Sequence, residues 1–266
     1  MDVSKIDLIY FSPTNSTKRV LELLAGVWKK DAVHWDMTDY AYAEKSGEFA
    51  AGDLVYMGVP SYGGRVPALA AKRLGQMRGQ KTPAVLAVTY GNRDYEDTLL
   101  ELSDIARRQG FVPTAAVAAV TEHSILRQYA SGRPDEEDKE ELRHFGEAIR
   151  DRIWSQSQEE APSLPVKGNH PYRGYSEVPL KPYTGKKCTG CGLCAKKCPA
   201  GAISPEDPRQ TDKTKCISCM RCVRICSNHA RIVNKVMLAA AGLKLKKECT
   251  VRKDNELVLP VSENIN

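Results

Sequence analysis

The chain has 266 residues, 42% of them hydrophobic and 27% charged, and a formal net charge of +6. This length allows one large domain or two modest ones, and the composition is that of a soluble globular protein. No apolar run approaches the roughly 20 residues of a membrane span, and the first ten residues lack the apolar segment of a secretion signal. We therefore expect a cytoplasmic protein without a membrane span.

Strand-like and helical patterns alternate over the first 160 residues. Apolar runs predict five strands, at residues 6–10, 32–35, 53–59, 83–89 and 111–120. Helical periodicity begins after residue 17 and recurs at residues 67–77, 95–109 and 134–154. Strands that alternate with helices form a parallel sheet covered on both faces. The pattern predicts an α/β domain over residues 1–160.

The first strand ends in a loop that is rich in hydroxyl groups. Ser12–Thr17 contains two serines and two threonines, and the helix that follows carries Lys18 and Arg19 in its first turn. Cations at this end oppose the helix dipole, and no capping-box acid follows Ser16. A phosphate bound at the free N–H groups of the helix would explain both features. The alternative is an ordinary polar turn capped by Ser16.

The third and fourth strands also end in loops that are typical of ligand-binding sites. Pro60–Pro67 and Tyr90–Tyr95 are rich in glycine and polar residues. In doubly wound sheets, ligands bind beyond the carboxyl ends of the strands. Tyr62 and Tyr90 are placed to stack on such a ligand. After the fifth strand, His123 is a catalytic candidate that could move protons, although a hydrogen-bonded structural histidine is the favoured interpretation.

Residues 161–182 separate this domain from the rest of the chain. They contain five prolines and little periodicity. The composition predicts an extended, stiff connector that sets the spacing between two domains.

Eight of the nine cysteines form two runs of identical spacing. The first run is Cys188, Cys191, Cys194 and Cys198, and it repeats after 28 residues as Cys216, Cys219, Cys222 and Cys226. A disulfide frame would distribute cysteines through a small exported chain, and structural zinc usually uses two separated pairs. Two runs at this spacing are typical of bacterial ferredoxins with two [4Fe–4S] clusters.

In that motif the fourth cysteine of each run binds the other cluster. One predicted cluster is therefore held by Cys188, Cys191, Cys194 and Cys226. The other is held by Cys198, Cys216, Cys219 and Cys222. Ser227 stands where the first run has Pro199, which concerns local geometry and not a ligand.

The net charge of the cysteine-rich segment differs from that of the rest of the chain. Residues 183–236 contain seven Lys and four Arg against three acids, a net charge of +8, which leaves −2 for the remainder. Because the basic residues surround the predicted cluster ligands, they favour an acidic partner or an anionic cofactor over nucleic acid. Residues 237–266 follow as a tail, for which we expect a helix at 237–247 and a hairpin around Asp254 and Asn255. Cys249 lies outside both runs and is expected to be structural.

Several of these segments resemble a known family. Ser12–Thr17 resembles the phosphate loop of flavodoxins, with Asn15 in place of the usual glycine, and Asn also tolerates the left-handed conformation. Pro60–Val66 and Thr89–Tyr95 resemble the two loops that hold the flavin ring. From Ile6 to about Val236, the chain resembles the fused flavodoxin–ferredoxin iron–sulfur flavoproteins of anaerobic bacteria and archaea.

The resemblance implies a fold, a flavin and the residues that bind it. The implied fold is a flavodoxin-like doubly wound α/β parallel sheet of five strands, in the order 2-1-3-4-5, with a small α+β bacterial ferredoxin-like domain at residues 183–236. The implied flavin is FMN. Its implied phosphate ligands are Ser12, Thr14, Asn15, Ser16 and Thr17. The implied ring contacts are Pro60, Ser61, Tyr62, Gly63, Gly64, Thr89, Tyr90, Gly91 and Asn92.

We interpret the chain as an electron-transfer protein that passes electrons between low-potential donors, two [4Fe–4S] clusters and FMN. The rival hypothesis is an FMN-dependent reductase of a small substrate, with residues 122–133 as a substrate wall. A redox sensor or assembly module has less support. Redox partner proteins are the expected partners. Because a stiff connector reaches outward more readily than it turns back, an exchanged homodimer is favoured, with the acids of residues 135–138 as a landing point for the basic segment.

Overall fold

A six-stranded sheet forms the centre of the α/β domain, and one of its strands comes from the tail. The computed structural model describes residues 3–40, 44–155, 163–175 and 178–261, and the strand order of this sheet is β10-β7-β6-β4-β1-β2. All pairs are parallel except the antiparallel pair of β10 and β7. The strands are β1 (Lys5–Tyr10), β2 (Ala32–Asp36), β4 (Asp53–Pro60), β6 (Thr82–Tyr90), β7 (Phe111–Val120) and β10 (Glu256–Val258). The predicted order 2-1-3-4-5 of the five parallel strands is confirmed.

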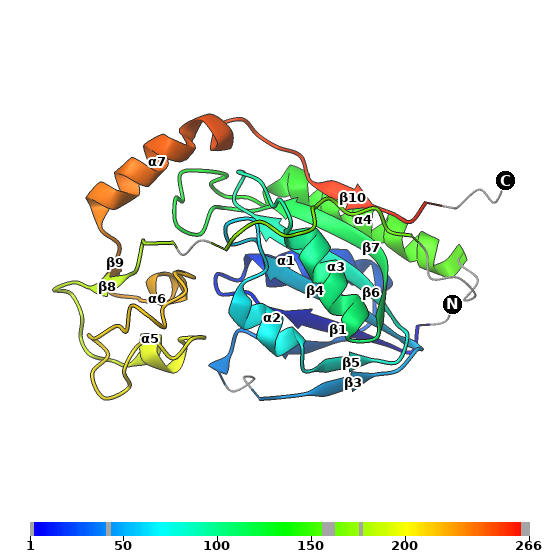
Figure 1. The fold of residues 1–266 in the computed structure, drawn as a ribbon, viewed down its shortest axis with the longest axis horizontal. Coiled ribbons are helices and arrows are strands. Elements are labelled where there is room, and N and C mark those ends of the chain that lie inside the picture. Colours follow the sequence, from blue (N-terminus) through cyan, green and yellow to red (C-terminus); the bar gives the residue numbers. More distant parts are fainter. Residues whose placement is uncertain (1–2, 41–43, 156–162, 176–177, 262–266) are drawn as a thin grey trace.

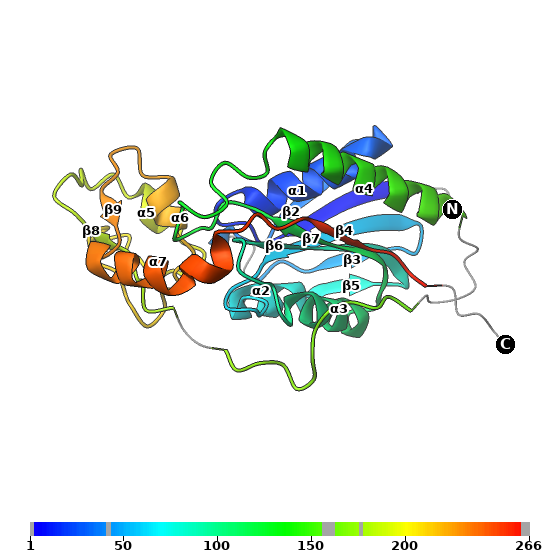
Figure 2. The same cartoon turned by 90° about the horizontal axis from the view of Figure 1, so that it is seen from above.

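Helices cover both faces of this sheet (Figures 1 and 2). One face carries α1 (Ser16–Ala25), η1 (Gly26–Trp28) and α4 (Glu136–Ser155), and the other carries α2 (Ala68–Leu74) and α3 (Thr98–Arg108). The strands are apolar on both sides, as a doubly covered sheet requires. Two short strands, β3 (Gly47–Phe49) and β5 (Met77–Gly79), pair beside the main sheet. In the part of the chain that the structure describes, no helix is both long and apolar enough to cross a membrane.

The cysteine-rich segment forms a small unit beside the sheet, beyond the carboxyl ends of the strands (Figure 1). Its two halves close through β8 (Tyr183–Thr184) and β9 (Arg231–Ile232), which pair antiparallel. Each half contributes one short helix, α5 (Leu193–Lys196) or α6 (Arg221–Arg224). The two helices are 28 residues apart, so the repeat in the sequence is also a repeat in the backbone.

The tail returns from the cysteine-rich unit to the sheet. Its helix, α7 (Lys235–Cys249), leads into β10, which pairs with β7 in the register Glu256 to Ala118. The expected hairpin around Asp254 and Asn255 is therefore wrong. Without the tail, the edge of β7 would have unpaired backbone groups. The tail pairs with them through β10, and next to this pairing Asn255 Oδ1 accepts a hydrogen bond of 2.8 Å from the Val120 amide.

The connector lies along α3 and is held there by side chains. Asp97, at the start of α3, accepts hydrogen bonds from the backbone N–H groups of Asn169 (2.9 Å) and Arg173 (2.7 Å). Asp104, two turns further along α3, accepts a hydrogen bond from the Tyr172 hydroxyl. Residues 163–175 therefore extend the surface of the α/β domain, whereas an extended, stiff connector that sets the spacing between two domains was expected.

The cysteine-rich unit docks on the α/β domain of its own chain. Arg73, in α2, is 1% exposed and donates hydrogen bonds to the carbonyl oxygens of Met37 and, at 2.7 Å, Pro199. Lys197 forms a salt bridge of 3.0 Å with Asp39. This arrangement differs from the exchanged homodimer that the stiff connector favoured. The described part of the connector, residues 163–175, is bound along α3 on the same chain.

Candidate cofactor sites

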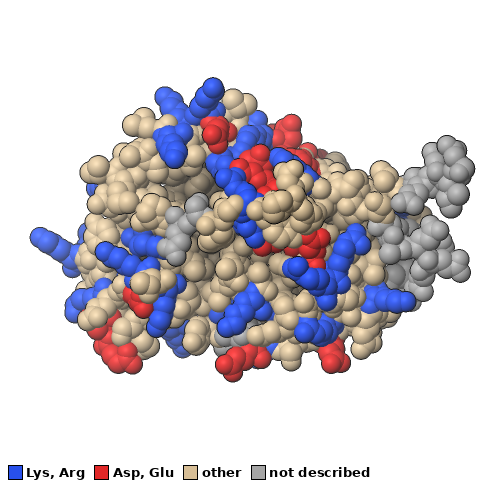
Figure 3. Space-filling view, in the orientation of Figure 1, with Lys and Arg blue, Asp and Glu red and all other residues tan. Residues whose placement is uncertain are grey.

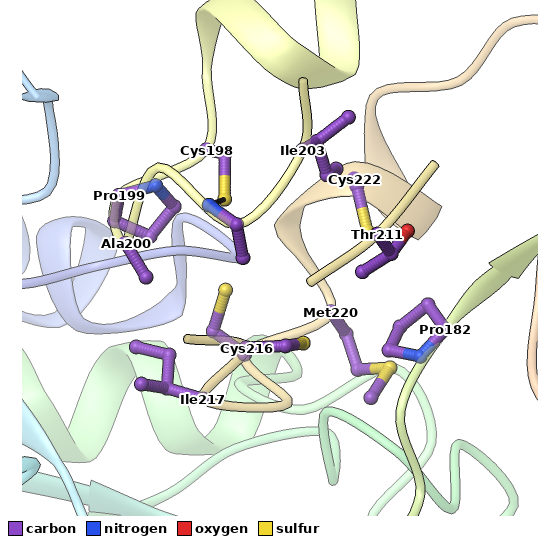
Figure 4. Close-up of a pocket in the computed structure, with 12 residues that line it drawn as sticks. Pro182, Cys198, Pro199, Ala200, Ile203, Thr211, Cys216, Ile217, Met220 and Cys222 are labelled. Atoms are coloured by element: carbon purple, nitrogen blue, oxygen red, sulfur yellow. Dashed lines mark hydrogen bonds between the residues drawn. The ribbon is translucent and has the colours of Figure 1, made fainter. Parts of the chain in front are cut away.

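The eight cysteines of the two runs surround two separate cavities. Each cavity measures about 20 Å³. The first is lined by Cys188, Cys191, Cys194 and Cys226. The second is lined by Cys198, Cys216, Cys219 and Cys222. Figure 4 shows Cys198, Cys216 and Cys222 around the second cavity. The structure thus brings together the two quartets that the crossed ligand pattern predicts.

Backbone N–H groups point at the sulfur atoms in a repeated pattern. The Ala202 amide donates to Cys198 Sγ and the Ala230 amide, 28 residues later, donates to Cys226 Sγ, both at 3.3 Å. These bonds are equal although one half has Pro199 and the other Ser227, so the departure in sequence leaves the ligand geometry intact. Amides that donate to thiolate sulfur stabilise the negative charge of an iron–sulfur cluster.

The loops between the cysteines use the left-handed conformation at equivalent positions. In the first half these positions are Gly190 (φ 76°) and Gly192 (φ 75°), and in the second half they are Ser218 (φ 54°) and Met220 (φ 60°). A side chain at positive φ is strained. The second half has this strained conformation at Ser218 and Met220. The turn around the sulfur atoms, rather than the conformational propensity of these residues, therefore sets the backbone conformation.

Burial makes three thiols of the second quartet, Cys216, Cys219 and Cys222, poor acids unless a metal compensates their charge. Burial raises the pKa of Cys222 to about 12 and raises the pKa of Cys219 well above its ordinary value. Thiolates are the form that binds metal, and metal binding supplies the missing positive charge. Four thiols around each cavity fit a [4Fe–4S] cluster, whose iron atoms take four cysteine ligands. Within the described ranges, no group of three or more His, Cys, Asp or Glu side chains is placed to hold a single metal ion.

The hydroxyl-rich loop precedes α1 in the geometry of an anion site. Asn15 is left-handed (φ 69°) and gives α1 no side-chain cap. In the described part of the chain, the backbone N–H groups of Ser16 and Thr17 have no acceptor. Thr14 Oγ1 and Ser16 Oγ lie 3.1 Å apart beside them. Uncapped amides and hydroxyl groups at a helix N-terminus bind phosphate well.

Two of the predicted phosphate ligands are buried and stabilise this loop by hydrogen bonds. Ser12 and Thr17 are buried. Ser12 Oγ accepts a hydrogen bond of 3.1 Å from the Lys18 amide. Thr17 Oγ1 lies 2.8 Å from Thr89 Oγ1 and so ties the loop to β6. Of the predicted phosphate ligands, Thr14, Asn15 and Ser16 line a cavity, together with Pro13 of the same loop.

The loops after β1, β4, β6 and β7 meet at one small cavity of about 50 Å³. The predicted ring contacts that line it are Pro60, Ser61, Tyr62, Thr89, Tyr90 and Gly91. Thr14 and Ser16 line it from the first loop. Glu122, His123 and Ser124, from the segment expected as a substrate wall, also line it. Thr121, which was not among the predicted site residues, lines it as well, and its position directly after a predicted strand was the available signal.

Three predicted ring contacts do not line this cavity. Gly63 and Gly64 form the turn that brings Tyr62 beside Arg65. Asn92 is buried, and its side chain donates hydrogen bonds to the carbonyl oxygens of Cys249 (2.7 Å) and Val251 (2.8 Å). Asn92 therefore holds the tail to the β6 loop and is unavailable to a flavin.

His123 is neutral and packs on Gly91. A Cβ atom at Gly91 would lie 2.7 Å from the His123 ring, so only glycine fits there. His123 Nδ1 accepts hydrogen bonds of 3.2 Å from the amides of Ile125 and Leu126, which places the ring proton on Nε2. Burial, with a contribution from the charge of Arg93, lowers the pKa of His123 to about 4. The geometry is that of a structural histidine, which was the favoured interpretation.

Tyr62 lies where the small cavity meets the cysteine-rich unit. It lines the cavity from the β4 loop. Its pKa is raised well above its ordinary value, first by burial and then by the negative charge that Cys219 carries when ionised. Ile217, which lies between the quartet members Cys216 and Cys219, packs against the core of the α/β domain, so the second quartet lies next to that domain.

A larger cavity of about 530 Å³ lies beside the small one. It extends from the hydroxyl-rich loop and residues 122–134 to α6 of the cysteine-rich unit, and it shares Thr14, Ser16, Glu122 and Ser124 with the small cavity. Arg221 and Arg224 reach it from α6. The sequence grouped these two arginines with the general basic charge near the ligands, and only the docking of the two units shows which surface they face.

The acids at the start of α4 are engaged within the α/β domain and tail. Asp135 and Glu137 form salt bridges of 2.8 and 3.0 Å with Arg252. Asp138 forms a buried ion pair with Arg133. The expectation that these acids receive the cysteine-rich unit is wrong, because the unit docks against α2 and the loop after β2.

Comparisons with known proteins found one family model and several solved structures that are similar to parts of this chain. A family model described as a 4Fe-4S dicluster domain matches residues 187–231. Flavodoxin 2 from Bacillus cereus is 15% identical, covers 56% of this chain and 99% of its own, and has a TM-score of 0.41. A flavodoxin from Streptococcus pneumonia TIGR4 is 16% identical over 56% of this chain and 99% of its own, with a TM-score of 0.38. The apo form of an NADH:FMN oxidoreductase (EMOB) is 16% identical over 58% of this chain and 91% of its own, with a TM-score of 0.40. A comparison with curated proteins found no match.

The strand order and the dicluster match define the class of protein. The chain joins a flavodoxin-like doubly wound sheet to a 4Fe–4S ferredoxin-like unit in one polypeptide. This combination supports a role in redox electron transfer.

Proposed function

We propose that this chain is an iron–sulfur flavoprotein that transfers electrons between two [4Fe–4S] clusters and FMN. The two cysteine quartets would hold the clusters. Thr14, Asn15 and Ser16, with the uncapped amides of α1, would hold the phosphate of FMN. The flavin ring would lie among the loops that carry Tyr62, Tyr90 and Gly91. When bound, FMN exchanges one or two electrons, and each cluster carries one.

The packing of Ile217, which lies between Cys216 and Cys219, against the core cluster that contains Tyr90 supports this proposal most directly. Electron tunnelling falls steeply with distance, so a cluster delivers electrons only to a cofactor that lies close by. The second quartet lies in the part of the unit that contacts the α/β domain, through Pro199 and Ile217. The first quartet lies on the other side of the unit, next to β8 and β9. We therefore assign the second quartet to the exchange with FMN and the first to external redox partners.

The residues of the chain also prepare the site for this exchange. Arg73 fixes Pro199, the neighbour of Cys198, against the α/β domain. His123 lines the small cavity, and its neutral ring carries the proton on Nε2, because Nδ1 is occupied by two backbone amides. A neutral donor keeps the same protonation state across the physiological range, which suits one-electron exchange better than proton transfer.

Cofactor analysis tests the proposal. We expect about eight iron atoms per chain and one released flavin that is FMN. Thr14→Ala should weaken FMN about tenfold or more, because it removes a hydroxyl donor to a charged phosphate. Thr14→Ser keeps the hydroxyl and should retain affinity. Stoichiometric zinc, or FAD in place of FMN, would contradict the proposal.

A steady-state assay with a panel of small acceptors distinguishes the proposed electron carrier from the reductase alternative. For a pure electron carrier, reduction of protein acceptors should proceed while small organic acceptors are reduced without saturation. Saturable turnover of one small acceptor would favour the reductase.

A further inference from the structure

The 530 Å³ cavity is built from both halves of the chain and is rich in guanidinium groups. Arg19 and Arg133 line it from the α/β domain, and Arg221 and Arg224 line it from α6. Glu122 is the one carboxylate among its lining residues. A cavity with this lining favours an anion. Figure 3 shows Lys and Arg side chains over the end of the molecule that the cysteine-rich unit forms.

Two of these four arginines are already paired. Arg133 forms the buried ion pair with Asp138. Arg224 forms a salt bridge of 3.3 Å with Glu122, which also holds Arg127 at 2.7 Å.

Arg221 differs from these two. It is half-buried at the start of α6, and among the described residues it has no carboxylate within ion-pair distance. It lines the same cavity as Thr14, Asn15 and Ser16 of the hydroxyl-rich loop. A half-buried cation that faces uncapped helix amides lacks a counter-charge, and a phosphate would satisfy both groups at once.

We propose that Arg221 is a ligand of the FMN phosphate, supplied by the cluster-binding unit to a site in the α/β domain. This inference rests on the proposed function, because it requires FMN at the hydroxyl-rich loop. The FMN site is then incomplete until the two units dock. Arg224, through its salt bridge with Glu122, holds α6 in place and positions Arg221.

Arg221 also lies next to Cys222, a member of the second quartet. Flavin binding and the cluster that delivers electrons to it would therefore share one short helix. A chain that fails to acquire its clusters should bind FMN more weakly, even though the hydroxyl-rich loop itself is unchanged.

The experiment compares FMN with riboflavin, which lacks the phosphate. Purified protein with its clusters intact is freed of flavin without oxygen and titrated with each flavin, and binding is followed by quenching of flavin fluorescence. Arg221→Gln should weaken FMN about tenfold or more and leave riboflavin unchanged. Arg221→Lys, which keeps the charge, should lose less. Arg209→Gln removes an exposed arginine of the same unit that lines neither flavin cavity and should change neither affinity.

Each outcome decides the inference. A selective loss of FMN, with iron content equal to that of the wild type, supports it. Equal weakening of both flavins would show that Arg221 acts on docking and not on phosphate, and unchanged affinity for both would show no role, so either result overturns it. If the wild type itself binds the two flavins equally, the phosphate site of the proposed function fails, and this inference fails with it.

Discussion

The guanidinium group of Arg73 donates a hydrogen bond of 2.7 Å to the carbonyl oxygen of Pro199, across the junction of the two units. Arg73 is buried, and it also donates to the carbonyl oxygen of Met37. Because Pro199 follows the quartet member Cys198, this bond fixes the position of the second quartet relative to the sheet. Burial lowers the pKa of Arg73, because moving this cation from water into the interface costs free energy.

Arg73→Lys should loosen the junction. Lysine keeps the charge but lacks the planar fork that reaches two carbonyl groups at once. We expect a loss of about 1–3 kcal/mol in the free energy of unfolding, since a buried carbonyl loses its donor. The rate of flavin reduction through the clusters should fall, with iron and flavin contents unchanged. Arg78→Lys, at an exposed arginine of β5, serves as the control, and an equal effect there would refute the role of Arg73.

The crossed quartets predict which cysteine variants resemble each other. Cys226→Ala should behave like Cys188→Ala, although the two residues belong to different runs, because both line the first cavity. Both variants should retain about four iron atoms and the same electron paramagnetic resonance spectrum of the remaining reduced cluster. Cys222→Ala removes a ligand from the second cavity, so the spectrum of this variant should be that of the cluster in the first cavity. A Cys226→Ala spectrum that matches Cys222→Ala would mean that each run holds its own cluster.

Docking within one chain predicts no complementation between chains. A flavin-poor variant, Thr14→Ala, can be mixed with a cluster-deficient variant that combines Cys188→Ala and Cys216→Ala. Flavin reduction by a low-potential donor should stay at the level of the separate variants, because each cysteine-rich unit is held to its own domain by Arg73 and the connector. Restored transfer at equimolar mixing would instead demonstrate exchange between subunits.

His123 predicts part of the acid sensitivity of the fold. Its pKa is about 4 in the folded chain, against 6.5 for an ordinary histidine. The unfolded chain therefore binds the proton more readily, and stability present above pH 6.5 is lost as the pH falls toward 4. The loss over this window amounts to about 3 kcal/mol.

His123→Asn tests this assignment. The Oδ1 atom of asparagine can accept the same backbone hydrogen bonds as Nδ1, but it does not titrate. Urea unfolding at about pH 7 and about pH 4.5 should show a smaller pH dependence for the variant than for the wild type. His144→Asn, at an exposed position of α4, controls for the loss of a histidine. An unchanged acid dependence in His123→Asn would assign the effect to other groups.

The sequence by itself determined the features that depend on local spacing. The 28-residue repeat predicts which cysteines share a cavity, because short loops fix where each sulfur points. The alternation of strands and helices predicts a parallel sheet, since parallel strands need a crossover between them, and the resemblance to flavodoxins implies its strand order. Asn15 was expected to accept the left-handed conformation, and it does so because its short polar side chain is tolerated there.

Tertiary structure alone decided the contacts between residues far apart in the chain. Asn92 was expected at the flavin ring, yet its amide is satisfied by carbonyl groups of the tail, more than 150 residues later. From its sequence, the tail could form a local hairpin or pair with the edge of β7. It pairs with β7, because the backbone groups of that edge are otherwise unpaired. Arg221 sits in a basic sequence that gives no sign of its target. Its role depends on where two folded units touch, and that is fixed by a few buried contacts such as the one between Arg73 and Pro199, which no local pattern encodes.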